Sequence, residues 1–337
     1  MGHATRCIPI INALLKAGFQ PILASDGDAL LLLQKEFPLL KYYTLPSYHI
    51  KYTEKGKNLK FKLFLSVPSI ILTVKKERKI VAQLIEKENL VGIISDNRFG
   101  VLSKKTPSVY ITHQLNVLSG KTTFLTSIIH QKIIEQFDEC WIPDVENELN
   151  FSGILGHLNK PKFPVKYLGI LSRFKQQKTA IKYDLLVLLS GLEPQRTLLE
   201  NKLLVELEGF KGEIFFIRGI LSNKTKITAA PNFKIINFLA STALENAINQ
   251  SEIVLARSGY STIMDLAILG KKAFFIPTPG QFEQEYLAEI LNKKLIAPFS
   301  TQQNFKVENL NVLTNFSGFK VNKIAVNLDL FSIFERK

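Results

Sequence analysis

A cluster of small polar residues follows an apolar run late in the chain, in the stretch ARSGYSTIMDLAIL that begins at Ala256. Residues 252–256, up to the start of this stretch, are predicted to form a short buried strand, and residues 261–269 a helix that ends at Gly270. A strand, a glycine turn and a helix N-terminus together form a place where an anion can bind, because backbone N–H groups point outward there. An ordinary strand–helix connection is the alternative interpretation of this turn.

Other residues able to do chemistry stand where a helix begins or a predicted strand ends. His3 precedes the helix predicted at 8–17. Histidine is the side chain whose ordinary pKa suits a general base near neutral pH. The remaining candidates share a position at the carboxyl end of a predicted strand: Asp96, Arg98, His113, Gln114, Ser190 and Gly191. Ligands bind at these ends in open α/β sheets, and solvated turns are the alternative.

Several common functional motifs are absent from the sequence. It contains no GxGxxG, no GxxxxGK[ST] and no GxSxG pattern, which removes the main support for dinucleotide, P-loop and serine-hydrolase functions. Its five histidines are scattered, and Cys7 and Cys140 lie in no metal-ligand spacing. We therefore expect neither a metal site nor a cofactor. With only two cysteines and no secretory signal, the chain is expected to be cytoplasmic.

Apolar runs of strand length alternate with helical patterns in both halves of the chain, which is typical of parallel sheets with crossover helices. The predicted strands lie at 19–24, 42–45, 90–95, 108–112 and 139–142 in the first half, and at 183–191, 213–217, 234–238, 252–256 and 273–277 in the second. A length of 337 residues also favours two domains. The sequence therefore predicts an α/β protein of two doubly wound, Rossmann-like domains that face a cleft.

Composition places the domain boundaries. The first domain is expected at 1–165, a linker rich in Pro and Lys at 166–182, the second domain at 183–320, and a segment at 321–337 that returns to the first domain. No strand precedes the helix at 8–17, although the first strand of a doubly wound sheet is usually central. We therefore expect that the chain starts late and lacks this strand.

Positive charge is concentrated in the first half. The net charge is +14, and residues 1–178 hold 25 Lys and Arg against 14 Asp and Glu. The segment 51–79 alone carries nine basic residues against two acidic ones around an apolar centre that is too short to span a bilayer. It is interpreted either as a core helix pair with solvated lysines or as a surface that rests on an anionic membrane.

Three blocks, GHATRCIPIINALLKAG from Gly2, ITHQLNVLSGKTTFL from Ile111 and ARSGYSTIMDLAILGKKAFFIPTPGQFEQEYLA from Ala256, resemble the B-type (GT-B) glycosyltransferases of family 28. Within that family the similarity is to the branch that adds N-acetylglucosamine to a lipid-linked peptidoglycan precursor. The resemblance covers most of the chain in order, and the third block is its specific part. It implies transfer from a nucleotide-sugar, a UDP-sugar in this branch, to a lipid-linked acceptor.

The resemblance also implies a role for individual residues. His3 corresponds to the base, Asp265 to the residue that binds the ribose hydroxyls, and Glu283 with Gln284 to the residues that contact the donor sugar. The rest of the implied nucleotide-sugar site consists of Arg173, Ser190, Gly191, Phe238, Leu239, Arg257, Ser258, Gly259, Tyr260, Ser261 and Thr262. The acceptor side is assigned to Asp96, Arg98, His113 and Gln114.

Two other functions remain open at this point. The GHATRC block also resembles the GH-x-x-RC turn of UDP-sugar hydrolases, in which the histidine activates water. A sugar-nucleotide-binding protein without catalysis would keep the same fold. The basic first half favours a large or anionic acceptor, and therefore transfer, on a protein that is peripheral to the inner face of the membrane. We expect no nucleic-acid partner.

Overall fold

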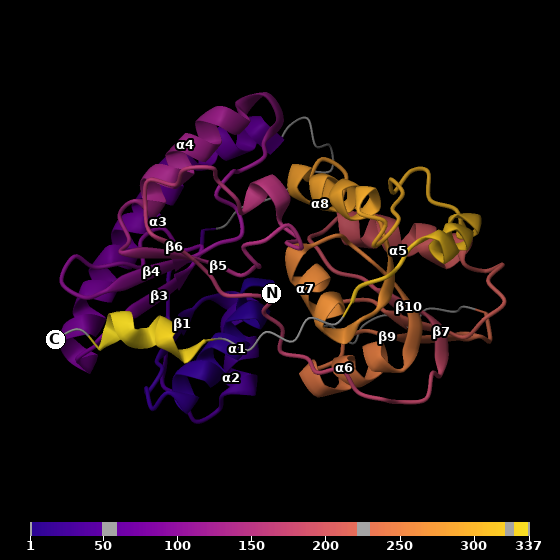
Figure 1. Cartoon of the computed structure of the whole chain (residues 1–337), viewed down its shortest axis with the longest axis horizontal. Helices are drawn as coiled ribbons and strands as arrows, with labels where there is room; N and C mark the ends of the chain where they lie inside the picture. Colours follow the sequence, from indigo (N-terminus) through magenta and orange to yellow (C-terminus); the bar gives the residue numbers. More distant parts are fainter. Residues whose placement is uncertain (1, 49–58, 221–229, 321–326, 336–337) are drawn as a thin grey trace. The chain divides into compact units, whose positions relative to one another are not determined.

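The computed structural model describes residues 2–48, 59–220, 230–320 and 327–335. These residues divide into two compact units (Figure 1). The first unit holds 2–48, 60–172 and 327–335, and the second unit holds 173–220 and 230–320. Both are α/β structures with parallel strands, as the alternating apolar runs predict.

The second unit is built on one parallel sheet of five strands in the order β11-β10-β7-β8-β9. The strands are β7 (Tyr183–Leu188), β8 (Ile214–Ile217), β9 (Phe233–Ile236), β10 (Ser251–Ala256) and β11 (Lys272–Phe275). Because β7 and β10 are neighbours but not consecutive, the direction of winding reverses between them, which makes this the switch point of a doubly wound sheet. The central strands are apolar because helices cover both of their faces; Leu185 and Leu255 have no exposed surface.

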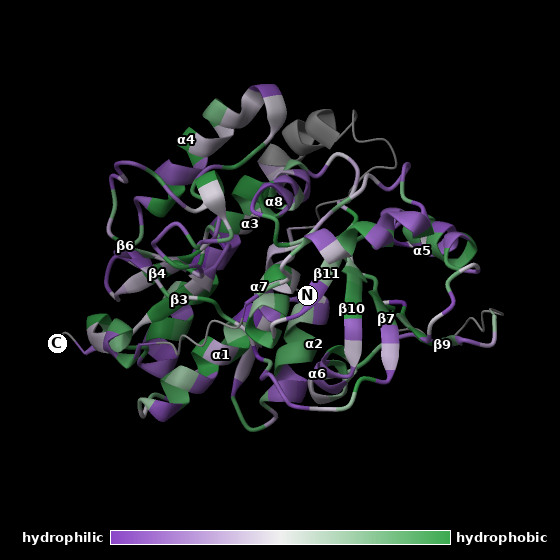
Figure 2. Ribbon diagram, turned by 45° about the vertical axis from the view of Figure 1, so that its right-hand side comes forward, coloured by the Kyte–Doolittle hydropathy of each residue, from purple (hydrophilic) through white to green (hydrophobic). Residues whose placement is uncertain are grey.

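Three of the described helices connect these strands, and a fourth helix and a 3₁₀ segment follow β11. They are α5 (Gln195–Glu206), α6 (Ser241–Asn249), α7 (Tyr260–Leu269), α8 (Phe282–Lys293) and η4 (Val307–Asn315). Helix α7 ends at Gly270, whose φ of 64° lies in the left-handed region that glycine favours, so the predicted helix and its stop are confirmed. Figure 2 shows much of α7 and the adjoining part of β10 in the green of hydrophobic residues, in keeping with their burial in the core.

The first unit contains two separate parallel sheets. One has the order β3-β4-β5-β6 and the other pairs β1 with β2. The strands are β1 (Leu23–Ser25), β2 (Tyr42–Thr44), β3 (Ile93–Asp96), β4 (Ser108–Ile111), β5 (Glu139–Ile142) and β6 (Val165–Tyr167). Strand β6 begins at the last residue expected for the first domain and continues into residues 166–167, which were assigned to the linker. The run is short and has a lysine at its centre, so the sequence carries little apolar signal there. The second unit begins at Arg173.

The helices of the first unit are α1 (Gly2–Lys16), α2 (Gly27–Glu36), α3 (Leu59–Glu88) and α4 (Thr123–Ile134), with 3₁₀ segments η2 (Gly120–Thr122), η3 (Gly153–Leu155) and η5 (Leu328–Phe334). Helix α3 is one continuous helix with Pro68 inside it, so the first of the two interpretations of 51–79, a helix pair, is wrong over its described part. The remainder of that segment, 51–58, lies outside the described residues.

The C-terminal segment packs into the first unit. The rings of Phe331 and Phe334 lie 5.9 and 6.3 Å from the ring of Phe19, and both contact Trp141 on β5. At Gly92 a side chain is excluded, because a Cβ there would lie 2.1 Å from Phe334. The last described helical segment therefore completes the core beside β5, although it follows the whole second unit in the sequence.

Candidate functional site

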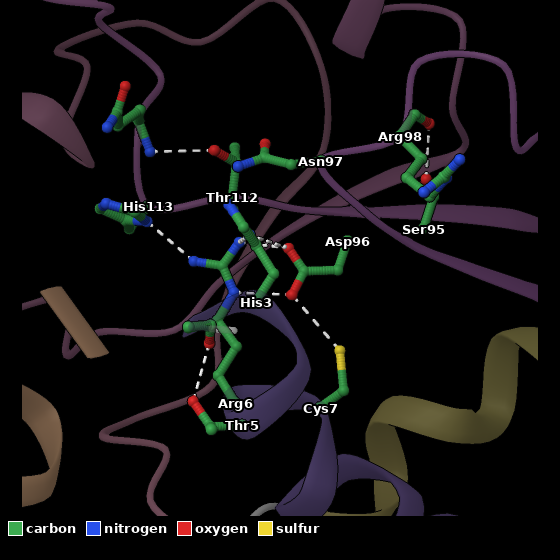
Figure 3. Close-up of polar contacts among 12 residues, drawn as sticks. His3, Thr5, Arg6, Cys7, Ser95, Asp96, Asn97, Arg98, Thr112 and His113 are labelled. Atoms are coloured by element: carbon green, nitrogen blue, oxygen red, sulfur yellow. Dashed lines mark hydrogen bonds and ion pairs between the residues drawn. The ribbon is translucent and has the colours of Figure 1, made fainter. Parts of the chain in front are cut away.

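The first unit brings the histidine near the N-terminus against the end of a distant strand (Figure 3). Nδ1 of His3 lies 3.0 Å from Oδ1 of Asp96, the last residue of β3. His3, Arg6 and Cys7 stand at i, i+3 and i+4 on α1, a spacing that puts all three on one face of a helix. All three contact the carboxylate of Asp96.

Arg6 lies at the centre of this cluster and is only 2% exposed. Its Nε donates to Oδ2 of Asp96 at 2.8 Å, and its Nη2 donates to Oδ1 of the same carboxylate. Nη1 lies 2.8 Å from Nδ1 of His113, the second residue after β4. The structure thus places three predicted residues, His3, Asp96 and His113, around an arginine to which the sequence analysis assigned no function. The signal that could have found it is its spacing from His3 in the motif GHATRC.

The charges in this cluster keep Asp96 ionised. Burial by itself would raise the pKa of Asp96, but the charges of Arg6 and His3 and their hydrogen bonds outweigh it and hold the pKa well below its usual value. The pKa of Cys7 is raised well above the usual value, first by burial and then by the charge of Asp96, so that Cys7 remains a thiol. Asp96 is therefore a fixed carboxylate that can accept a hydrogen bond from Nδ1 of His3, which aims Nε2 away from it. An imidazole held in this way can act as a general base.

Two of the residues assigned to the acceptor have other partners. The oxygens of Asp96 are occupied by His3, Arg6 and Cys7, which fills the usual capacity of a carboxylate. The guanidinium of Arg98 bonds to Glu77 at 2.7 Å and to Asp26 at 2.5 Å, and also to the carbonyl of Pro46.

Arg98 therefore connects β3 to the residues that follow β1 and β2, and two carboxylates neutralise its charge. This arrangement argues against the expected acceptor-side role of Arg98, and it explains how the two sheets of the first unit are joined. His113 is 5% exposed and Gln114 is half-buried.

In the second unit, two turns leave the sheet side by side at the switch point. Ala256 of β10 pairs with Leu188 of β7, so the turns that follow these strands start at the same level. Gly191 has a φ of 105°, which requires glycine, whereas Gly259 is the N-cap of α7 with ordinary extended backbone. A Cβ added at either glycine would meet no atom within 4 Å. The N-terminus of α7 therefore opens onto free space, in which an anion has access to backbone N–H groups.

Several side chains implied in the nucleotide-sugar site are turned inward instead. Arg257 is 1% exposed, and it donates through Nη1 to the carbonyls of Ile276 and Pro277 at 3.1 and 3.0 Å. Its Nη2 donates to the carbonyl of Gln195 at 2.9 Å and to Oε1 of Gln302 at 2.7 Å. Burial lowers the pKa of Arg257 to about 10. Arg257 thus holds the turns after β7 and β11 together and offers only its backbone to a ligand.

Ser258 and Gln284 fix the neighbouring loop in a similar way. Oγ of Ser258 donates to the carbonyl of Gln284 at 2.8 Å. The Gln284 amide accepts from the backbone N–H of Thr278 at 2.9 Å and donates to Gln281 at 2.7 Å. The side chain of Gln284 therefore shapes the loop between β11 and α8, which differs from the expected contact with the donor sugar.

The other implied residues lie around the same sheet edge. Ser190 is exposed, Tyr260 is buried, and Phe238, Leu239, Ser261, Thr262, Asp265 and Glu283 are half-buried. Asp265 lies one helical turn into α7. Arg173 donates to Oγ of Ser241, the first residue of α6, at 2.9 Å and lies over the ring of Phe174, so it docks on its own unit near the end of β9.

A buried charge network lies beneath these turns and was missed from the sequence. Glu200 of α5, 2% exposed, accepts from Arg196 at 2.6 Å and also from Arg218, which directly follows β8. Arg218 in turn donates to Asn237 after β9 at 3.0 Å. Because each partner is hydrogen-bonded, the network connects the ends of β8 and β9 to α5 rigidly. Only the i, i+4 spacing of Arg196 and Glu200 indicated it.

Within the described ranges, no group of three His, Cys, Asp or Glu side chains is arranged to hold a metal ion. None of the helices in those ranges combines the length and the apolar character that crossing a bilayer demands.

Comparisons with known proteins agree with this geometry. Residues 196–315 match the glycosyltransferase family 28 C-terminal domain. In an alignment of 325 residues that covers 93% of this chain and 86% of the relative, the chain is 24% identical to the UDP-N-acetylglucosamine–N-acetylmuramyl-(pentapeptide) pyrophosphoryl-undecaprenol N-acetylglucosamine transferase of Haemophilus ducreyi.

Solved structures show the same fold. The spinosyn rhamnosyltransferase SpnG superposes with a TM-score of 0.66 at 13% identity, covering 99% of this chain and 97% of the other. MurG of Acinetobacter baumannii superposes with a TM-score of 0.55 at 14% identity, covering 93% and 86%. The matches favour a transferase over the hydrolase considered above. The chain is a glycosyltransferase with the GT-B fold, and residues 196–315 of its second unit are similar to the C-terminal domain of family 28.

Proposed function

We propose that the chain transfers a sugar from a UDP-sugar to a hydroxyl group of a lipid-linked acceptor, with His3 as the general base. The observation that carries the proposal is the contact between His3 and Asp96, which orients an imidazole at the edge of a parallel sheet. The Haemophilus ducreyi relative supports the choice of substrates, because its name specifies a UDP-sugar donor and an undecaprenol-linked acceptor.

In the proposed reaction, Nε2 of His3 takes the proton of the acceptor hydroxyl while its oxygen forms the new bond to the anomeric carbon. The bond from that carbon to the diphosphate breaks, and UDP leaves with the electron pair. One displacement of this kind inverts the anomeric configuration. A positioned general base contributes on the order of a hundred- to ten-thousand-fold to the rate.

The second unit is proposed to bind the donor. The diphosphate would lie at the N-terminus of α7, above Gly259 and beside Gly191, where neither residue carries a side chain to block it. Helix N-termini favour an anion by about 0.3–1 kcal/mol at exposed sites. Asp265 would accept hydrogen bonds from the ribose hydroxyls of the donor. The backbone of Phe238 and Leu239 would contact its nucleobase. We propose that the backbone N–H groups at the N-terminus of α7, without a metal ion, stabilise the departing diphosphate.

The first unit is proposed to rest on the anionic inner face of the cytoplasmic membrane, where a lipid-linked acceptor would be reached. Helix α4 presents Phe124, which is 80% exposed, together with exposed Leu125 and Ile129. Lys121 and Lys132, near its two ends, are also exposed. Figure 2 shows hydrophobic and hydrophilic segments side by side on α4. Apolar side chains flanked by lysines suit a membrane surface, where the acyl chains are apolar and the lipid headgroups are negatively charged. The lysines at 55 and 57 lie outside the described residues.

Incubation with UDP-sugars, with and without a lipid extract, tests the activity. Release of UDP that depends on the extract, with the sugar recovered in the lipid fraction, is the expected result. Release of UDP and free sugar without the extract would contradict transfer and would indicate that the protein hydrolyses the UDP-sugar. UDP binding in calorimetry without turnover in either condition would indicate a binding protein.

Sedimentation with liposomes tests the membrane surface. Binding should require anionic lipid and fall at high salt, because each lysine near the surface contributes about 1 kcal/mol that salt screens. A variant with Phe124, Leu125 and Ile129 changed to Ser should bind less than the parent, and so should a variant with Lys55, Lys57, Lys60 and Lys62 changed to Gln. A variant with Leu192 and Leu198 changed to Ser is the matched control, since these exposed residues lie in the second unit. A parent protein that ignores anionic liposomes at low salt would contradict the proposal.

A further inference from the structure

Nδ1 of His3 has two neighbours that make opposite demands on it. Oδ1 of the ionised Asp96 carboxylate, at 3.0 Å, can only accept a hydrogen bond, so this contact needs a proton on Nδ1. Nη2 of Arg6, at 2.8 Å, can only donate, so it needs a bare Nδ1. One ring nitrogen cannot satisfy both. The position of the ring proton therefore decides which contact is a hydrogen bond.

The two arrangements differ in what they leave for catalysis. When Nδ1 carries the proton and donates to Asp96, Nε2 has a free lone pair and can take a proton. When Nδ1 accepts from Arg6, the proton of the neutral ring lies on Nε2, and the ring cannot act as a base there. Arg6 does not need His3 as a partner, because its Nε and Nη2 already bond to both oxygens of Asp96 and its Nη1 lies against His113.

We propose that Arg6 is a positioning residue for His3: it clamps Asp96 against the ring, so that the carboxylate holds the proton on Nδ1 and Nε2 keeps the free lone pair that a base needs. The proposal rests on the proposed role of His3 as the base. Arg6 contacts no substrate in this scheme and acts through Asp96. His113, whose Nδ1 accepts from Arg6, keeps its own ring proton on Nε2 and holds the guanidinium in place.

The charges around His3 in the described part of the chain support this balance. Asp96 on β3 carries one negative charge and Arg6 on α1 carries one positive charge, and both lie within 3.0 Å of the ring. Cys7 on α1 stays a neutral thiol that donates to Oδ2 of Asp96 at 3.3 Å. His113, after β4, is neutral because its Nδ1 accepts from Arg6. The ring of His3 thus faces one ion pair whose two charges nearly cancel.

Removing Arg6 and removing Asp96 should therefore shift the titration midpoint of His3 in opposite directions. Without Arg6, the negative charge of Asp96 is uncompensated and stabilises the imidazolium, so His3 holds its proton to higher pH. Without Asp96, the positive charge of Arg6 is uncompensated and disfavours the imidazolium, so His3 loses its proton at lower pH. A charge at this distance shifts a titration by about 1–3 units, and exposure of the ring places the effect at the lower end.

The test uses the full-length protein and the variants Arg6→Gln, Arg6→Lys, Asp96→Asn and the double variant Arg6→Gln/Asp96→Asn. The titration midpoint of the His3 ring is followed by NMR without substrate, and the acidic limb of the pH–rate profile is measured with donor and acceptor. Thr5→Ala is the matched control, because Thr5 lies on the same turn of α1 but, among the described residues, donates its hydroxyl hydrogen bond to the carbonyl of Gly2.

We expect the midpoint and the acidic limb to rise by about one pH unit in Arg6→Gln, to fall by about one unit in Asp96→Asn, and to return close to the parent in the double variant. Arg6→Lys keeps the charge but not the two-pronged contact, so its midpoint should move less than that of Arg6→Gln while turnover still falls. Nitrogen chemical shifts should report the Nδ1–H tautomer in the parent and Nε2–H in Asp96→Asn. Guanidinium ion should partly restore turnover to Arg6→Ala and not to His3→Ala.

A shift in the same direction in both single variants, or no shift in either, would overturn the proposal. A purely structural role for Arg6 would lower thermal stability and turnover without moving the midpoint in the folded fraction, which NMR observes directly. If His3→Ala keeps full turnover, the base assignment fails, yet the opposite shifts of the ring remain measurable. The two failures are therefore distinguishable.

Discussion

The two units present their functional residues in different ways. In the first unit the candidate site is made of side chains, with Arg6 in contact with His3, Asp96 and His113, and His3 in contact with Asp96. In the second unit it is made of backbone, since the two glycines at the switch point leave open space while Arg257 turns its side chain inward. A base needs one lone pair aimed at one proton, which only a supported side chain provides. A diphosphate needs several N–H groups, which a turn and a helix N-terminus provide together.

This difference has a consequence for mutation. Side-chain changes in the first unit should affect turnover, whereas side-chain changes near the turns of the second unit should affect stability or binding according to whether the residue faces inward or outward. Four predictions test the contrast.

The largest effect is expected for His3→Ala. Turnover should fall on the order of a hundred- to ten-thousand-fold, while UDP affinity measured by calorimetry stays unchanged, because His3 belongs to the first unit. Lys16→Ala, at the other end of α1, is the control. Equal rates for His3→Ala and the parent would contradict the role of His3 as the general base. A loss of UDP affinity that matches the loss of turnover would place His3 in the donor site.

The buried histidine of α4 should make the first unit sensitive to pH. Burial lowers the pKa of His130 to about 4 from an ordinary value of 6.5. Between these values the unfolded chain binds a proton that the folded unit does not, so stability is complete above about pH 6.5 and is lost as the pH falls through 4. The full loss is about 3 kcal/mol.

Fluorescence of Trp141, the one tryptophan, follows unfolding of the first unit, in which it is fully buried. Urea midpoints of the parent should drop between pH 7 and pH 5 by more than those of His130→Gln, whose amide can still bond to the hydroxyl of Tyr110 but does not titrate. Identical pH dependence in the two proteins would mean that His130 is protonated as readily in the folded unit as in the unfolded chain.

The two glycines of the second unit should separate stability from binding. Gly191→Ala forces a side chain into a φ of 105° and should cost about 1–3 kcal/mol of stability. Gly259→Ala is free of backbone strain, and its Cβ enters the space proposed for the diphosphate, so UDP affinity should fall about tenfold, or 1.4 kcal/mol. Thermal unfolding and calorimetry on both variants measure the two effects. Unchanged UDP affinity in Gly259→Ala would exclude the N-terminus of α7 as the diphosphate site.

The smallest effect is expected for Asp265→Ala, which should weaken UDP binding by about 0.5–1.5 kcal/mol through loss of hydrogen bonds to the ribose. The deoxyribose form of the nucleotide should bind the parent more weakly and should show a smaller difference between parent and variant. Glu289→Ala, an exposed position on α8, serves as the control. Calorimetry that finds the same affinity for parent and Asp265→Ala would remove Asp265 from the site.

Most of the secondary structure was predictable because its signals are local. The helix at 261–269 and its stop at Gly270 follow from apolar periodicity and from the one residue type that tolerates a positive φ. Strand β6 was missed for the same reason, since three residues with a lysine at their centre carry almost no local signal. The helix-pair interpretation of 51–79 is wrong over its described part, because α3 runs continuously through Pro68.

The sequence by itself determined which residues reach the ends of the strands, and through its motifs it determined the family to which the second unit is similar. Only the tertiary structure decided what those residues contact. Asp96 and Arg98 are two positions apart, yet one holds His3 and the other joins the two sheets through Asp26 and the carbonyl of Pro46. Arg257 carries a charge but faces the interior. The reason is physical: a side chain bonds to whatever partner the packing of distant strands and helices brings within about 3 Å, and that distance is not encoded by spacing along the chain.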